Sequence, residues 1–124
     1  MVILARLGRS FGFALRGVRV AVAGRNFRIH LVAMAVVIAL VVAYGVTGTQ
    51  LGVVVLSTAI VISTELINTA IERLCDFIAE LHGIDRDPRI RDIKDLAAAG
   101  VLVVALGAAV NGVIVFGPLL APGQ

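Results

Sequence analysis

Residues 51–76 read LGVVVLSTAIVISTELINTAIERLCD, and this stretch decides the fold. Its first part, residues 51–64, contains no charged residue. Its second part places Glu65, Asn68, Glu72 and Asp76 at spacings of three, four and four. A helix that rises 1.5 Å per residue needs about 20 residues to cross a bilayer core of about 30 Å. The stretch therefore predicts a membrane-spanning helix whose second half carries polar groups.

These polar residues form a stripe on the predicted helix, because successive residues turn by about 100°. If the helix starts near Leu51, Glu65 lies about 21 Å further along, still inside the bilayer. A carboxylate in hydrocarbon is costly unless it faces protein, water or a cation, so such acids are functional by default. The alternative, that Glu65 and Asn68 only bond to neighbouring helices or subunits, stays open.

The composition predicts an all-α integral membrane protein with a single domain over residues 1–124. The chain has 124 residues, of which 60% are hydrophobic and 15% are charged, and its mean hydropathy is +1.05. A soluble domain of this length needs far less apolar surface. Three transmembrane helices are expected, over residues 29–46, 51–77 and 96–120. The single cysteine, Cys75, excludes an intrachain disulfide and is expected to be a packing residue.

The basic residues predict the orientation of the chain. Every lysine and arginine lies before the first span, at Arg73 near the end of the second span, or in the link over residues 81–95. Cytoplasmic loops of membrane proteins carry an excess of such residues. We therefore expect the N-terminus and the 81–95 link to be cytoplasmic and the C-terminus to lie outside.

Residues 1–25 predict an amphipathic helix on the cytoplasmic membrane surface. Leu4, Leu7, Phe11 and Leu15 recur every three or four residues, with arginines offset from them, which is the pattern of an interfacial helix. The arginines could serve adhesion to anionic lipids or bind phosphate, and both readings stay open.

The polar stripe suits phosphoryl transfer to an alcohol in the membrane. Acids near the interface can hold Mg²⁺ through oxygen ligands, a deeper acid can take a proton from a hydroxyl, and nearby cations can hold polyphosphate. The sequence contains no GxxxxGK[ST] loop, so a nucleotide would be held by side chains from several helices.

Three segments resemble one family, the small bacterial membrane kinases that comprise diacylglycerol kinase and undecaprenol kinase. ELINTAIERLCD, residues 65–76, is similar to the family signature ExxN[ST]xxExxxD. KDLAAAGVL, residues 94–102, resembles a second conserved block. RNFRIHL, residues 25–31, resembles the entry to the first span in the Gram-positive, undecaprenol-type branch. The resemblance extends from about Phe11 to Phe116.

The resemblance implies a homotrimer of three-span subunits in a bacterial inner or plasma membrane, with active sites shared between subunits and with ATP and Mg²⁺ bound. Its catalytic residues would be Glu65 as general base, Asn68 as an ordering residue, Lys94 on the phosphates and Asp95 as an orienting acid. Its metal residues would be Glu72, as the principal ligand, and Asp76, which matches the final acid of the signature. Its nucleotide-binding residues would be Arg6, Arg9, Phe13, Glu80, His82 and Lys94.

The chain departs from the family at two places. The family usually has a glutamate metal ligand two positions before the asparagine of RNFR, and Gly24 stands there in this chain. The link segment GIDRDPRIRDI is also longer than the resemblance implies. It is either a solvated charged loop or a segment that contacts nucleotide or lipid headgroups.

We therefore expect an ATP-dependent and Mg²⁺-dependent lipid kinase without a nucleic-acid partner. The resemblance of RNFRIHL favours undecaprenol over diacylglycerol as the acceptor. Two alternatives stay open. One is a noncatalytic trimeric membrane protein, a degenerate relative that lacks the glutamate at position 24. The other is a small proton-coupled transporter that uses Glu65 as its carrier.

Overall fold

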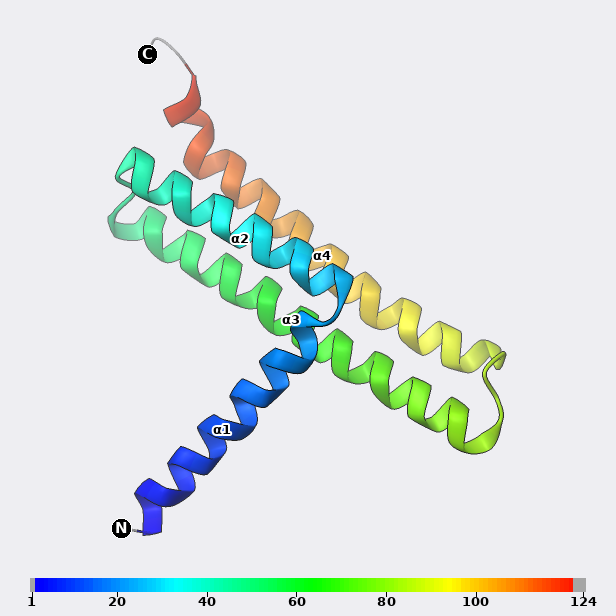
Figure 1. Ribbon diagram of the computed structural model, residues 1–124. Helices are drawn as coiled ribbons and strands as arrows, with labels where there is room; N and C mark the ends of the chain where they lie inside the picture. The colour runs from blue at the N-terminus through cyan, green and yellow to red at the C-terminus, as the bar shows by residue number, and fades with distance from the viewer. Residues whose placement is uncertain (1, 122–124) are drawn as a thin grey trace.

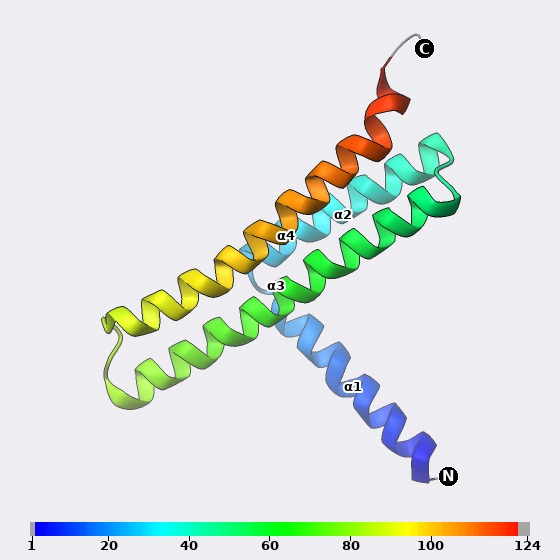
Figure 2. The ribbon, with the colours of Figure 1, turned by 180° about the vertical axis from the view of Figure 1, so that it is seen from behind.

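The computed structural model describes residues 2–121 and contains four helices. These are α1 (Val2–Val22), α2 (Arg25–Tyr44), α3 (Gly48–His82) and α4 (Pro88–Leu120). Helices α2, α3 and α4 lie side by side, and α1 leaves the bundle at a steep angle where α2 begins (Figures 1 and 2). The described residues contain no strand, so the all-α prediction is confirmed. Residues 122–124, part of the tail predicted to lie outside, fall beyond the described range.

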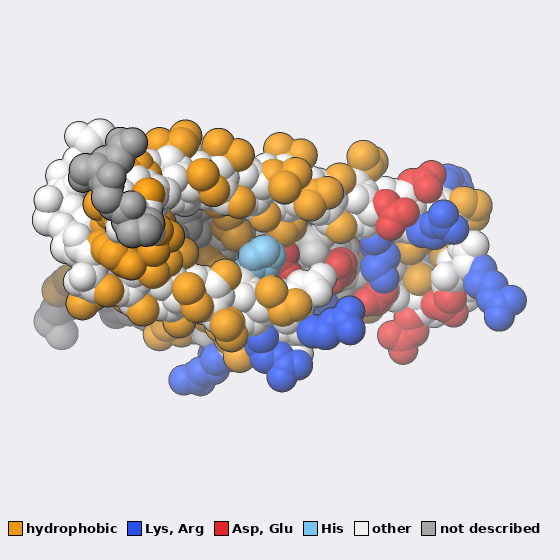
Figure 3. All heavy atoms as spheres, turned by 90° about the horizontal axis from the view of Figure 1, so that it is seen from above, with side chains coloured by type: hydrophobic (Ala, Val, Ile, Leu, Met, Phe, Trp, Pro, Cys, Tyr) orange, Lys and Arg blue, Asp and Glu red, His pale blue; other side chains and the backbone are white. Residues whose placement is uncertain are grey.

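The outer surface of the bundle is largely apolar. Helices α2, α3 and α4 are each long and apolar enough to cross a membrane. Side chains in the middle of these helices are exposed, including Val36, Leu56, Val103 and Leu106. Hydrophobic side chains cover most of the length of the molecule, acidic side chains lie toward one end, and lysine and arginine side chains lie there and along the lower edge of the view (Figure 3). Soluble monomers rarely expose so large an apolar surface, and the three spanning helices predicted from hydropathy are confirmed.

A cluster of buried hydrophobic residues joins the helices at the end of the bundle that lies away from the charges. Val46, Val54, Val115 and Phe116 are buried together there, and partly buried residues of α2 pack against them. One polar contact also joins the long antiparallel pair α3 and α4, because Asn111 Nδ2 donates a hydrogen bond to Ser57 Oγ at 2.9 Å. Polar side chains that hydrogen-bond across helices are a common way for membrane-spanning helices to associate.

Glycines end two of the helices. Gly45 follows α2 and Gly83 follows α3, with φ of 60° and 64°. Glycine adopts this left-handed conformation without steric cost. After Gly83 the chain turns back, since the Ile84 N–H donates to the Ala79 carbonyl at 3.0 Å. Both turns return the chain along the bundle in few residues.

Helix α4 begins earlier than the hydropathy predicts. Asp87 caps it, because its carboxylate accepts hydrogen bonds from the Arg89 backbone N–H at 2.9 Å and from the Arg89 guanidinium at 2.7 Å. The hydrogen bonds from Arg89 lower the pKa of Asp87 to about 2. Pro88 occupies the first turn, where its missing N–H is not needed. Residues 88–95, assigned above to the link, are therefore helical, and the connection between helices is 83–87 rather than 81–95.

Candidate active site

The polar stripe runs along α3 from the interior of the bundle toward its charged end. Glu65 and Asn68 are buried, with exposed fractions of 2% and 3%. Glu72 is half-buried and Asp76 is exposed. Because the four residues follow the helical repeat, their side chains share one side of α3 while their exposure rises along it. Cys75, which lies between the last two acids in the sequence, is buried, with an exposed fraction of 4%.

A hydrogen bond fixes the orientation of the two middle residues of the stripe. Asn68 Nδ2 donates to Glu72 Oε1 at 3.1 Å. The amide nitrogen therefore faces the half-buried acid, and the amide oxygen faces away from it. The ordering role predicted for Asn68 is compatible with this contact, because the contact holds the Glu72 carboxylate in place.

A cavity of about 670 Å³, here called the charged pocket, lies where α1 ends and α2 begins against α3. The residues of its lining that matter here are Gly24, Arg25, Glu65, Glu72, Arg73 and Asp76. The Arg73 guanidinium donates to the Val20 carbonyl at 3.4 Å and so ties the end of α1 to α3. Three of the predicted acids thus face one cavity, together with two arginines.

A smaller cavity of about 220 Å³, here called the chamber, lies between α2, α3 and α4. Its polar lining residues are Asn26, His30, Glu65 and Asn68. Glu65 and Asn26 line both the chamber and the charged pocket. The buried carboxylate of Glu65 therefore stands between the two cavities.

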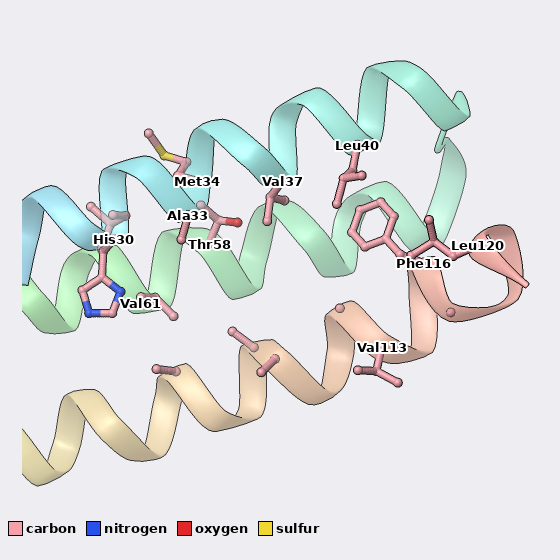
Figure 4. Close-up of a pocket in the computed structure, with 16 residues that line it drawn as sticks. His30, Ala33, Met34, Val37, Leu40, Thr58, Val61, Val113, Phe116 and Leu120 are labelled. Carbon is pink, nitrogen blue, oxygen red and sulfur yellow. The ribbon is translucent and has the colours of Figure 1, made fainter.

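A third cavity, here called the apolar groove, has a volume of about 530 Å³ and runs between α2 and α4 over α3. His30 and Thr58 are the polar residues in its lining, and no charged residue contributes to it. Figure 4 shows His30 at one end of the groove and Leu40 and Phe116 at the other, with Val37 and Val61 between them. The groove therefore leads from the apolar end of the bundle toward the chamber.

Lys94 lies beside the stripe. Its ammonium donates to Asp76 Oδ1 at 2.7 Å across the antiparallel pair α3 and α4. Asp95 instead is exposed and forms an ion pair with Arg91 at 3.7 Å, on the outside of α4. The structure thus brings Lys94 to the predicted acids and leaves Asp95 apart from them.

The other predicted nucleotide residues lie away from the charged pocket of the same chain. Arg6, Arg9 and Phe13 are exposed on α1, and Glu80 and His82 are exposed at the end of α3. None of these five lines a cavity described above. The Arg16 guanidinium lies 4.7 Å from the centre of the Phe13 ring. Their role in nucleotide binding stays a prediction.

The donor set around Glu72 suits a hard cation that keeps an open coordination shell. Among residues 2–121 no group of three His, Cys, Asp or Glu side chains is close enough to enclose a metal. Mg²⁺ is commonly bound through one or two carboxylates, water and substrate phosphates rather than in an all-protein cage. Glu72 and Asp76 line the charged pocket with oxygen atoms, so they fit such an open site.

Sequence reasoning missed two residues that line these cavities, Asn26 and His30. Both belong to the RNFRIHL segment, and they stand four residues apart. His30 lies at the start of the first span predicted over residues 29–46, where a histidine is more simply an interfacial residue. The spacing places both side chains on one face of α2, and this signal could have marked them as partners of α3.

The sequence profile of the prokaryotic diacylglycerol kinase family matches residues 12–116. The chain belongs to this family. Two curated relatives are similar along most of the chain. Undecaprenol kinase of Bacillus subtilis is 32% identical over 94% of this chain and 93% of its own length. Diacylglycerol kinase of Synechocystis is 34% identical over 90% of this chain, and the aligned region covers 63% of the length of that relative. No solved structure matches.

Membership in the prokaryotic diacylglycerol kinase family confirms the resemblance drawn from ELINTAIERLCD, and it identifies the protein as a membrane-embedded lipid kinase. The matched range includes the whole polar stripe, Lys94 and the start of α2, and therefore both polar cavities.

Proposed function

We propose that the protein transfers the γ-phosphoryl group of ATP to the hydroxyl of a membrane lipid and that it requires Mg²⁺. The observation that supports this most is the position of Glu65. Its buried carboxylate lines the charged pocket on one side and the chamber on the other. A soluble phosphate donor and a hydrophobic acceptor have to meet at a boundary of this kind. A buried acid there suits proton transfer from the acceptor hydroxyl.

In this proposal each residue of the stripe has one task. Glu65 accepts the proton of the acceptor hydroxyl, and Asn68 holds the Glu72 carboxylate through its hydrogen bond. Glu72 and Asp76 offer oxygen ligands for Mg²⁺, which, when bound, neutralises phosphate charge. Lys94 holds phosphate oxygens from across the α3 and α4 pair. It is already close to the stripe through Asp76.

For the acceptor we propose undecaprenol in preference to diacylglycerol. The relative named undecaprenol kinase aligns over 93% of its own length with this chain. The relative named diacylglycerol kinase is considerably longer than the region it shares. The RNFRIHL segment supports the same choice.

We further propose a homotrimer in the bacterial inner or plasma membrane, with its charged end in the cytoplasm. The opposite end, formed by the turn between α2 and α3 and the C-terminal part of α4, carries no lysine or arginine, so the positive-inside rule places the charged end in the cytoplasm. The exposed positions of Arg6, Arg9 and Phe13 support shared sites, because α1 of one subunit could serve the charged pocket of the next. Family membership also makes a noncatalytic protein or a proton-coupled transporter the weaker interpretation.

The test is phosphoryl transfer by the purified protein with Mg·ATP. Undecaprenol and diacylglycerol are offered in separate mixed micelles, and labelled phosphate is followed into each lipid. Wild type should label undecaprenol with the higher kcat/KM. Label in neither lipid would refute the proposed function.

Glu65→Gln provides the second arm, because the isostere keeps the shape and loses proton acceptance. It should lower kcat by about 100-fold or more, with trimer assembly and nucleotide binding retained. The exposed Asp92→Asn serves as the matched control and should leave activity unchanged. Full activity of Glu65→Gln would exclude Glu65 as the base, and loss of the trimer would assign it a structural role instead.

A further inference from the structure

The lining of the charged pocket combines acids with two arginines. Glu65, Glu72 and Asp76 contribute carboxylates, and Arg25 and Arg73 contribute guanidinium groups. A phosphate group that enters this space meets these carboxylates at close range, so it is repelled unless cations offset them. Mg²⁺ would be one such cation, and the arginines of the lining are the others.

Lys94 alone is a limited source of the positive charge that a phosphate needs here. Its ammonium is held by Asp76 Oδ1 at 2.7 Å, and Lys94 does not belong to the lining of the charged pocket. Moving the ammonium to a phosphate separates it from this carboxylate. A cation that already faces the pocket and has no carboxylate partner can bind phosphate without breaking an ion pair.

Arg73 is a cation of this kind. It follows Glu72 directly in α3, and its guanidinium donates to the Val20 carbonyl at 3.4 Å. This distance is longer than the usual N–H···O distance of about 2.7–3.2 Å. Among residues 2–121 Arg73 forms no ion pair. Because a guanidinium has several N–H donors, most of those of Arg73 remain available to a ligand.

The contact with Val20 can be given up at little cost. Val20 lies in the last turn of α1, where a helix leaves its carbonyl groups without intrahelical donors. The next carbonyl, that of Ala21, accepts the Gly24 N–H at 2.8 Å. Val20 is exposed, so water can take the place of the guanidinium at its carbonyl. A phosphate oxygen is the stronger acceptor, because donor and acceptor then both carry charge.

We propose that Arg73 binds the phosphates of the donor nucleotide and that its hydrogen bond to Val20 is the contact that the donor replaces. The guanidinium makes this exchange without leaving the pocket, because Val20 and Arg73 both line it. Helix α1 ends beside α3 at this point (Figure 1), so the exchange also removes a tie between the two helices. This inference rests on the proposed function and adds to it a phosphate-binding residue next to Glu72.

The first experiment removes the charge. Arg73→Met should raise the KM for ATP about tenfold or more. It should raise the inhibition constant of inorganic triphosphate, which lacks base and sugar, by the same factor. The matched control is Arg19→Met, which removes an exposed arginine from the last turn of α1 that lines none of the three cavities. The control should keep both constants within about twofold of wild type.

The second experiment separates phosphate binding from the attachment of α1. Arg73→Lys keeps the positive charge, whereas Arg73→Gln keeps an N–H donor for the Val20 carbonyl and carries no charge. Lysine should therefore recover more of the affinity for inorganic triphosphate than glutamine does. Equal constants for the two variants would show that Arg73 acts only by holding α1, and would overturn the proposal.

The third experiment distinguishes the donor from a lipid headgroup as the source of phosphate. The kinetics of Arg73→Met and wild type are compared in neutral detergent micelles with and without phosphatidylglycerol. The loss caused by the substitution should be the same in both. A loss confined to micelles that contain phosphatidylglycerol would assign Arg73 to anionic headgroups instead.

Equilibrium binding keeps this inference separate from the lipid kinase activity. Calorimetry with Mg²⁺ and a non-hydrolysable ATP analogue should give Arg73→Met a Kd raised by the same factor as its KM for ATP. An unchanged Kd, or an Arg73→Met enzyme with the kinetics of Arg19→Met, would overturn the inference. A wild-type protein that binds the analogue but labels neither lipid would instead refute the proposed function and leave the phosphate role of Arg73 to the binding result.

Discussion

Replacing Lys94 by methionine should separate catalysis from stability. The Lys94 ammonium donates to Asp76 at 2.7 Å, but the two side chains are 36% and 68% exposed. Ion pairs as exposed as this one contribute at most about 1 kcal/mol to stability. A hydrogen bond from a charged group to a bound phosphate contributes about 1.5–3 kcal/mol, which corresponds to roughly 10- to 150-fold in kcat/KM.

Lys94→Met should therefore lower kcat/KM for ATP by roughly 10- to 150-fold while it lowers the free energy of unfolding by no more than about 1 kcal/mol. The assay is steady-state ATP kinetics in detergent on samples whose oligomeric state matches that of wild type, with thermal unfolding measured on the same samples. Lys94→Arg should restore only part of the activity, because the guanidinium is larger and planar.

The matched control is Arg91→Met. Arg91 also lies at the charged end of α4 and pairs with an acid, Asp95, at 3.7 Å, but Asp95 is not a residue of the polar stripe, whereas the partner of Lys94 is Asp76 of the stripe. The Arg91→Met variant should keep kcat/KM for ATP within about twofold of wild type, a difference too small to reflect a lost phosphate contact. A Lys94→Met enzyme that also stays within that range would refute the phosphate role. An equal loss in both variants would mean that positive charge at this end acts only through topology.

Two further changes test the metal site and the packing of the span. Gly24 has φ −75° and ψ 138°, which any residue can adopt, and an added Cβ would lie 3.1 Å from the Ala21 carbonyl oxygen. Gly24→Glu should therefore fold after a small shift of the backbone. The added carboxylate should lower the half-saturating Mg²⁺ concentration several-fold. An unchanged Mg²⁺ titration would show that another group already fills the site. Ser57→Ala removes the acceptor of the Asn111 hydrogen bond. It should lower the free energy of unfolding by about 0.5–2 kcal/mol in a denaturation titration without changing kcat. A large loss of activity would contradict the purely structural role assigned to Ser57.

Much of the bundle follows from the sequence because hydropathy and helical periodicity are local signals. The uncharged run before Glu65 marks a spanning helix, and the three-four-four spacing places the acids on one side of it. The start of α4 could not be found from hydropathy, because hydropathy locates the bilayer and not the first turn of a helix. The Asp87 and Pro88 pair carries that signal instead.

The cavities were beyond sequence reasoning for a different reason. Residues of α2 and α4 line the same cavities only because both helices pack on α3 with a particular rotation, and no single helix pattern specifies that rotation. The partner of Lys94 shows the same limit. The resemblance assigned Lys94 to the phosphates, and only the structure shows that Asp76 holds its ammonium. The nucleotide residues predicted on α1 line none of the three cavities, so their role remains a prediction.

The burial of Cys75 gives the protein an internal reporter. It is the only cysteine in the sequence, it is 4% exposed, and it stands next to Asp76 and within one turn of Glu72. A thiol reagent can modify it only when α3 separates locally from its neighbours, so the labelling rate measures the free energy of that opening. A ligand that holds α3 against its neighbouring helices at the stripe would slow the labelling of Cys75. Its binding could therefore be followed in the native chain without introducing any substitution.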